Sequence, residues 1–119
     1  MNKVDLKTRT KSFALRVITL VESLPKGRTA DVLGKQLLRC GTSVGANYRA
    51  ACRARSTADF IFKMGIVEEE VDEAIFWMEL LVEAGLIKID DLKELMDEAD
   101  QLLAITVASI KTARNKSRK

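Results

Sequence analysis

The amino-acid sequence predicts an all-α protein, an antiparallel up-down-up-down four-helix bundle. Apolar residues recur at alternating three- and four-residue steps in four long segments, and this spacing places them on one face of a helix. The connections between the segments are short, and no segment shows the strict alternation of a β-strand. Long helices joined by short connections are typical of antiparallel bundles. The chain of 119 residues is expected to form a single domain, residues 1–119, with a basic C-terminal tail at about 111–119.

The first helix is expected over about residues 5–24, where Pro25 ends it. The second is expected to run from Thr29, its predicted N-cap, to about residue 54. Gly41–Ser43 is weak in helix propensity, so a kink or a loop at this point stays open as an alternative. Small residues on one flank of the second helix indicate that another helix approaches closely there: Gly34, Gly41, Gly45 and Cys52.

The third helix is expected over residues 57–84, capped by Ser56 or the residue after it. Gly85 is expected to end it in a left-handed conformation. Asp91 and Glu94 resemble a capping box at the start of the fourth helix. The core face of the fourth helix is predicted from heptad spacing: Leu92, Leu95, Ala99, Leu102, Thr106, Ser109 and Ala113.

The third helix carries two apolar faces, although a helix of a small monomer needs only one. One of them, from Phe60 to Leu81, is expected to face the core of the bundle. The other, here called the second apolar face, is expected to contact a neighbouring copy and consists of Phe62, Ile66, Phe76, Trp77 and Leu80. Glu and Asp residues form an acidic band between the two faces. The pattern therefore predicts a homo-oligomer.

Cations gather on the second helix, although the net charge of the whole chain is only +3. Four of them fall within an arc of about 80° and extend along about 27 Å of helix. We call these four the basic stripe: Lys35, Arg39, Arg49 and Arg53. A ridge of this kind is suited to the phosphate backbone of a nucleic acid. Two alternatives stay open, namely pairing with the acidic third helix of a neighbouring subunit and a merely solvated face.

The basic tail allows a similar choice. It is either a flexible arm that binds phosphate or the solvated end of the fourth helix, where cations suit the helix dipole. Its candidate nucleic-acid ligands are Arg114, Lys116, Arg118 and Lys119.

The composition disfavours catalysis and metal binding. The chain has no His, so a Ser or Cys nucleophile lacks the usual base, and the Glu-x-x-His pairs of di-metal bundles are missing. No Gly-rich loop between a strand and a helix is present to hold a phosphate-containing cofactor. We expect no enzyme activity, no cofactor and no metal, with Cys40 and Cys52 as buried free thiols. The N-terminus lacks the features of a secretion signal and no stretch approaches the length of a membrane span, so the expected location is cytoplasmic.

Three runs in the middle of the chain carry a family resemblance: Ser43-Val44-Gly45-Ala46-Asn47-Tyr48-Arg49-Ala50-Ala51, Lys63-Met64-Gly65-Ile66 and Phe76-Trp77-Met78-Glu79-Leu80-Leu81. With them the chain resembles the four-helix bundle proteins encoded in intervening sequences of bacterial 23S ribosomal RNA genes. The resemblance implies a cytoplasmic bundle that assembles into a ring-like homopentamer. A related branch, the accessory proteins of diversity-generating retroelements, binds nucleic acid and a reverse transcriptase through a basic surface. One departure is Glu68-Glu69-Glu70, where a Lys-Gly-Ser stretch is common, and it argues against phosphate contacts by the third helix.

Two functions follow from these observations. The first is a non-enzymatic homo-oligomer that binds RNA, or another nucleic acid, through the basic stripe and the tail. The second is a structural or adaptor oligomer that binds a protein partner, such as a reverse transcriptase, and uses the basic stripe for contacts between subunits.

Overall fold

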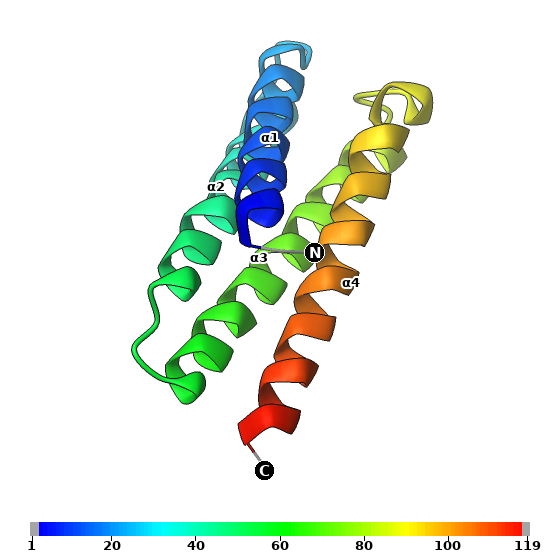
Figure 1. Cartoon of the computed structure of the whole chain (residues 1–119). Coiled ribbons are helices and arrows are strands. Elements are labelled where there is room, and N and C mark those ends of the chain that lie inside the picture. Colours follow the sequence, from blue (N-terminus) through cyan, green and yellow to red (C-terminus); the bar gives the residue numbers. More distant parts are fainter. Residues whose placement is uncertain (1–2, 118–119) are drawn as a thin grey trace.

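The computed structural model describes residues 3–117 and consists of four α-helices in an antiparallel bundle (Figure 1): α1 Lys3–Glu22, α2 Arg28–Cys52, α3 Thr57–Glu83 and α4 Ile89–Ser117. None of these residues forms a strand. The bundle is elongated, with extents of 52 × 21 × 20 Å. The predicted fold class and the order of the helices are confirmed.

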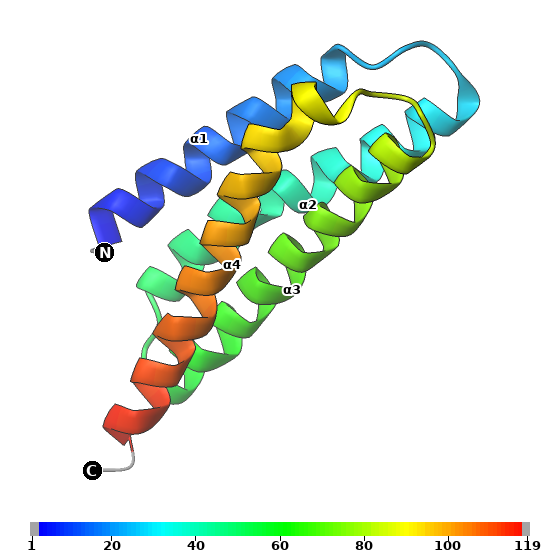
Figure 2. The same ribbon diagram turned by 90° about the vertical axis from the view of Figure 1, so that its right-hand side faces the viewer.

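Helices that follow one another in the sequence also lie side by side. α2 packs against α1 and α3, and α4 packs mainly against α3. α1 and α4 contact each other over a shorter stretch, and Figure 2 shows them diverging towards the N-terminal end of α1. Arg9 joins these two helices by donating to the Glu98 carboxylate, at 3.0 Å from its Nε, and to Gln101 at 3.1 Å. Since α2 and α4 each contact both α1 and α3, whereas α1 and α3 do not contact each other, α1 and α3 lie at opposite corners of the bundle.

All four helices contribute apolar side chains to one core. The largest fully buried ones include Phe13 of α1, Leu37 of α2, Met64 and Met78 of α3, and Leu92 of α4. Each such side chain contributes about 1.5–3 kcal/mol relative to an exposed one. The core face of α3 is thus the face that the sequence predicts.

Both ends of α3 form as predicted from local chemistry. The Ser56 hydroxyl accepts a hydrogen bond from the Asp59 N–H at 3.0 Å, so Ser56 is the N-cap. At the other end Gly85 has a φ of 75°, its N–H donates to Val82, and the Leu86 N–H donates to Leu81. These two bonds define a Schellman motif, which turns the chain towards α4.

Other helix ends differ from the prediction. α2 begins at Arg28 with Gly27 as its N-cap, so Thr29 lies inside the first turn and does not cap the helix. α4 begins at Ile89, which places Asp91 in the first turn, so the predicted capping box is wrong. An acidic side chain in that turn still interacts favourably with the helix dipole. α1 ends at Glu22, two residues earlier than predicted.

The structure also tests two predictions about the interiors of α2 and α4. α2 is continuous through Gly41–Ser43, so the alternative of a break is wrong, and the hydroxyl of Ser43 donates to the Arg39 carbonyl within the helix. In α4 the buried face continues to Ile110, whereas Ser109 is only half-buried. A straight α-helix has 3.6 residues per turn and drifts away from a strict heptad, which explains this shift.

The two cysteines are free thiols with different surroundings. Cys40 is buried, and burial raises the pKa of its thiol to about 12, so it stays protonated and unreactive at neutral pH. Cys52 is only half-buried, which differs from the expectation of two buried thiols.

Three of the four predicted residues of the small flank of α2, the glycines, form a close helix contact as predicted, and the approaching helix is α1. A Cβ added at Gly41 would lie 2.9 Å from both methyl carbons of Val17. At Gly45 it would lie 3.3 Å from the Thr10 Oγ1. We call Gly34, Gly41 and Gly45 the glycine flank. Glycine there lets the backbone of α2 come close to α1.

Gly41→Ala is expected to lower the free energy of unfolding by up to about 2 kcal/mol, because overpacking costs about 1–3 kcal/mol and alanine returns about 1 kcal/mol of helix propensity. Val17 is branched at Cβ and has little rotamer freedom with which to move away. The matched control is Gly65→Ala in α3, where a Cβ would meet nothing within 4 Å, and it should raise stability by about 0.5–1 kcal/mol. Urea denaturation followed by circular dichroism at one protein concentration tests both. Equal effects at the two positions would contradict a close contact at Gly41.

Candidate nucleic-acid interface

The basic stripe lies on the face of α2 opposite the core. All four of its residues are exposed, whereas Val44 and Leu37 on the other side of the helix are fully buried. Lys35, Arg49 and Arg53 form no ion pair or hydrogen bond of their side chains with any residue between 3 and 117. Three cations of the stripe are therefore uncompensated by acidic neighbours.

Arg39 differs from the other three because it is paired within its own subunit. Its guanidinium donates to Glu70 of α3 at 3.3 Å and to Glu73 of the same helix. The bond to Glu73 raises the pKa of Arg39. The side chain remains 49% exposed, so this is a surface contact that salt screens. The stripe can thus pair with an acidic third helix, but here the partner is the subunit's own α3.

The pairing of Arg39 follows from the geometry of the α2–α3 hairpin. Arg39 lies thirteen residues before the end of α2, and Glu70 lies thirteen residues after the start of α3. Antiparallel helices of equal rise place such residues at the same level. Folding the sequence about the connection at residues 53–56 would have revealed this contact, which a projection of one helix does not show.

Two cations of α1 lie in the same region, although the sequence pattern did not indicate them as ligands. Lys7 and Lys11 line a groove between α1 and α2 that Arg49 also lines. Their spacing of four residues gives them one helical face. That face adjoins α2 only because the glycine flank brings α1 to this side.

The predicted tail cations lie partly within the described structure. Residues 111–117 are helical and complete α4, with Arg114 and Lys116 exposed. Arg118 and Lys119 lie outside the described residues. Lys116 lines a groove of about 720 Å³ together with Arg55, which follows α2. The C-terminal ends of α2 and α4 lie at the same end of the bundle (Figure 1). The described part of the tail, residues 111–117, and Arg53 are therefore at one end of the molecule.

The second apolar face of α3 is less continuous than predicted. Phe62 and Phe76 are exposed, at 69% and 49%, whereas Ile66, Trp77 and Leu80 are half-buried. The rings of Phe76 and Trp77 pack edge-to-face, with centroids 5.0 Å apart. The buried Trp77 indole N–H finds no acceptor in the described part of the chain. Two aromatic side chains on one face of α3 therefore remain uncovered in the single chain.

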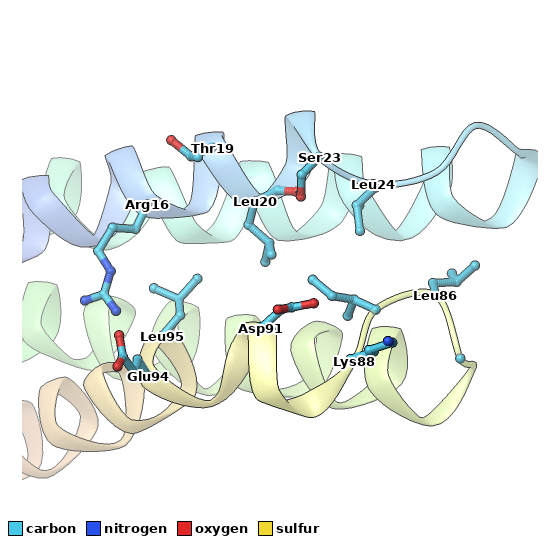
Figure 3. A pocket seen from close by; sticks show the side chains of 12 residues that line it. Arg16, Thr19, Leu20, Ser23, Leu24, Leu86, Lys88, Asp91, Glu94 and Leu95 are labelled. Carbon is cyan, nitrogen blue, oxygen red and sulfur yellow. The ribbon is translucent and has the colours of Figure 1, made fainter.

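A cleft of about 880 Å³ separates the C-terminal part of α1 from the start of α4 (Figure 3). Arg16 of α1 and Glu94 of α4 point towards one another across it, and Leu20 and Leu95 also line it. The Ser23 hydroxyl in this cleft donates to the Leu20 carbonyl at 2.6 Å. The cleft holds charges of both signs on an apolar floor and lacks the surplus of cations found along α2.

Neither a metal-ligand cluster nor a membrane-spanning helix occurs among residues 3–117. Among residues 3–117 no three His, Cys, Asp or Glu side chains are placed to hold a metal ion. Within the same range no helix has the length and apolar character needed to cross a membrane.

The fold and its surface define a class: an elongated all-α four-helix bundle with uncompensated cations along α2 and acidic residues along α3. The chain belongs to the 23S rRNA-intervening sequence protein family, whose sequence pattern matches residues 2–108. A crystal structure of a protein of unknown function from the S23 ribosomal protein family of Bacteroides thetaiotaomicron is similar, with 33% sequence identity and a TM-score of 0.86. The similarity covers 93% of this chain and 99% of that one. No curated protein matches this chain. The family resemblance is confirmed, and neither description names an enzymatic activity.

Lys35→Gln and Arg39→Gln form a matched pair that tests the pairing of Arg39. Each removes one cation from α2, one helical turn apart. The plot of log affinity for RNA against log salt has a negative slope. Lys35→Gln should reduce the magnitude of this slope by roughly 0.7–0.9, the value for one lost phosphate contact. Arg39→Gln should leave the slope unchanged, because Glu70 and Glu73 already neutralise this guanidinium. Fluorescence anisotropy with a labelled RNA across a salt series measures both. Equal losses would show that Arg39 leaves its carboxylates for the ligand.

Proposed function

We propose that this protein is a non-enzymatic homo-oligomeric bundle that binds nucleic acid, in the first place RNA, through the basic stripe of α2. The single observation that carries the proposal is the set of three exposed and unpaired cations Lys35, Arg49 and Arg53. Lys35 and Arg49 project from α2 and Arg53 is its C-cap residue, so the three cations extend along about 27 Å. The proposed place of action is the cytoplasm, where RNA is available as a partner.

Phosphate binding is favoured over a merely solvated face by the separation of charge. In the described structure the acidic residues of α3 neutralise Arg39 alone among the four stripe residues. The remaining cations keep a positive potential over the outer face of α2. A polyanion gains affinity there by releasing its condensed counterions. Contacts of this kind fix position and orientation without specifying a base sequence.

The comparisons support the proposal through fold and family only. The family is described by the intervening sequence of a ribosomal RNA, and the similar crystal structure is assigned to a ribosomal protein family. The first description names a ribosomal RNA, the second names a ribosomal protein family, and neither assigns a binding activity. The exposed cations of this chain are thus the main support.

The second candidate function is an adaptor oligomer that binds a protein partner, such as a reverse transcriptase. The observation in its favour is the pair of exposed aromatic residues Phe62 and Phe76 on α3. Exposed aromatic residues are enriched at protein interfaces. In this alternative the basic stripe serves contacts between subunits, and the pairing of Arg39 with Glu70 and Glu73 of its own α3 is an example of the charge complementarity that such contacts would use.

The proposal can be tested on the whole stripe at once. Replacing Lys35, Arg39, Arg49 and Arg53 together by Gln keeps helix propensity close to the original. The variant should stay helical and oligomeric, yet lose affinity for RNA with a smaller salt slope, by roughly 0.7–0.9 for each lost contact. Anisotropy titrations and circular dichroism measure these quantities. Dissociation of the oligomer with unchanged RNA binding would favour the adaptor function.

The assembly of the protein can be tested in solution. Light scattering should give a mass several times 13.3 kDa, near that of five subunits as the family resemblance implies. Phe62→Ser with Phe76→Ser should shift this mass towards the monomer, because burial of an aromatic side chain contributes about 1.5–3 kcal/mol. The control is Leu15→Ser on α1, a residue that is 58% exposed, which should leave the mass unchanged. A monomeric wild-type protein at micromolar concentration would refute the assembly.

A further inference from the structure

A groove of about 470 Å³ runs between α1 and α2, and its charged residues are all cations. Lys7 and Lys11 come from α1, and Arg49 comes from α2. All three are exposed, and none forms an ion pair with another described residue. The groove therefore concentrates three like charges in a concave site.

The groove exists because its floor is built from small residues. Ala14 of α1 and Gly45 and Ala46 of α2 line it between the cations. Gly45 lies so close to α1 that an added Cβ would be 3.4 Å from the Thr10 backbone. No long side chain fills the space between the two walls. A concave surface of one charge sign with walls of low dielectric focuses the field on an anion inside it.

The positions of the cations suit an extended anion rather than an isolated one. Lys7 and Lys11 are separated by one helical turn, a rise of about 6 Å along α1. Arg49 faces them from the other wall. On α2 the arc of the basic stripe that contains Arg49 also contains Lys35 and Arg53, so an anion in the groove would continue along the stripe. A backbone with successive phosphates meets this arrangement of charges.

Two of the three threonine hydroxyl groups that line the groove, those of Thr10 and Thr42, are engaged within their own helices. The Thr10 hydroxyl donates to the Lys7 carbonyl at 3.2 Å, and the Thr42 hydroxyl donates to the Leu38 carbonyl at 2.7 Å. Their protons are thus used within the helices. No aromatic side chain lines the groove, so it provides no platform for base stacking.

We propose that the α1–α2 groove is a phosphodiester-binding site, in which Lys7, Lys11 and Arg49 hold the backbone of an RNA strand independently of its sequence. This inference rests on the proposed function and extends the interface from α2 to α1. The acidic band of a second copy is the competing occupant. Two acids of α3, Glu70 and Glu73, are already engaged by Arg39 and are therefore less available to the groove of another copy.

The test replaces Lys7 and Lys11 together by Gln. The matched control replaces two exposed lysines, Lys88 just before α4 and Lys93 within it, which removes the same charge away from the groove. Affinity for labelled oligouridine and labelled oligoadenosine is measured by fluorescence anisotropy across a salt series. The groove variant should lose about 1.4 from the salt slope, two contacts of about 0.7 on single strands, equally for both probes. The control should keep the wild-type slope.

The outcomes separate this inference from the proposed function. If the wild-type protein binds neither probe nor duplex RNA, the groove site and the proposed function are both refuted. If it binds and the groove variant keeps the wild-type slope, only the groove site is refuted. A loss confined to one base composition would refute binding through the backbone alone. Disassembly of the groove variant in light scattering, with the slope intact, would make the groove a subunit interface and also refute the site.

A charge-preserving variant guards against a defect in folding. Lys7→Arg with Lys11→Arg keeps both cations and should retain the wild-type slope and thermal transition. If the Gln variant unfolds, this variant and the single change Arg49→Gln carry the test. Arg49→Gln alone should reduce the magnitude of the salt slope by about 0.7. No reduction there, with a folded protein, would refute the proposed role of the groove.

Discussion

The close approach of α1 to the glycine flank of α2 is the contact on which the surface of this protein depends. At Gly41 an added Cβ would lie 2.9 Å from Val17, so any side chain there would push the two helices apart. The same contact sets which residues of α1 become neighbours of α2. It buries Val17 and Thr10 and brings Lys7 and Lys11 beside Arg49. A packing constraint in the interior thus determines the arrangement of charge outside.

The electrostatic pattern arises from separation rather than from a large excess of charge, since the chain carries a net charge of only +3. Acidic residues gather on α3, and cations gather on α2 and on the adjoining face of α1. Arg39 is the point where the two regions meet, and its bonds to Glu70 and Glu73 neutralise it. Charges on the solvent side are screened beyond about 8–10 Å at physiological salt. The cations of the α1–α2 groove therefore act on a ligand only at short range.

The parts of the fold that could be predicted from the sequence are those set within one helix. Ser56 and Gly85 were predictable because capping depends on residues a few positions away. Thr29 was not an N-cap, because Gly27 takes that place and α2 begins earlier. The exposed face of the basic stripe followed from the period of 3.6 residues, but the partner of Arg39 and the position of Lys7 depend on how separate helices pack. Projection of a single helix contains no information about that packing, whereas the register of the α2–α3 hairpin does.

The arrangement of the bundle keeps the two proposed surfaces apart. α2 lies between α1 and α3, which do not pack against each other, so the α1–α2 groove and the exposed aromatic residues of α3 belong to different sides. Assembly through Phe62 and Phe76 would leave Lys7, Lys11 and Arg49 open. Each groove offers only a few phosphate contacts, and a single subunit would bind weakly at physiological salt. An oligomer repeats the groove on one particle, and linked sites raise the overall affinity by a factor of about 10²–10⁴ without new contacts. In the proposed function, oligomerisation is thus what turns a shallow, sequence-independent groove into an effective RNA-binding surface.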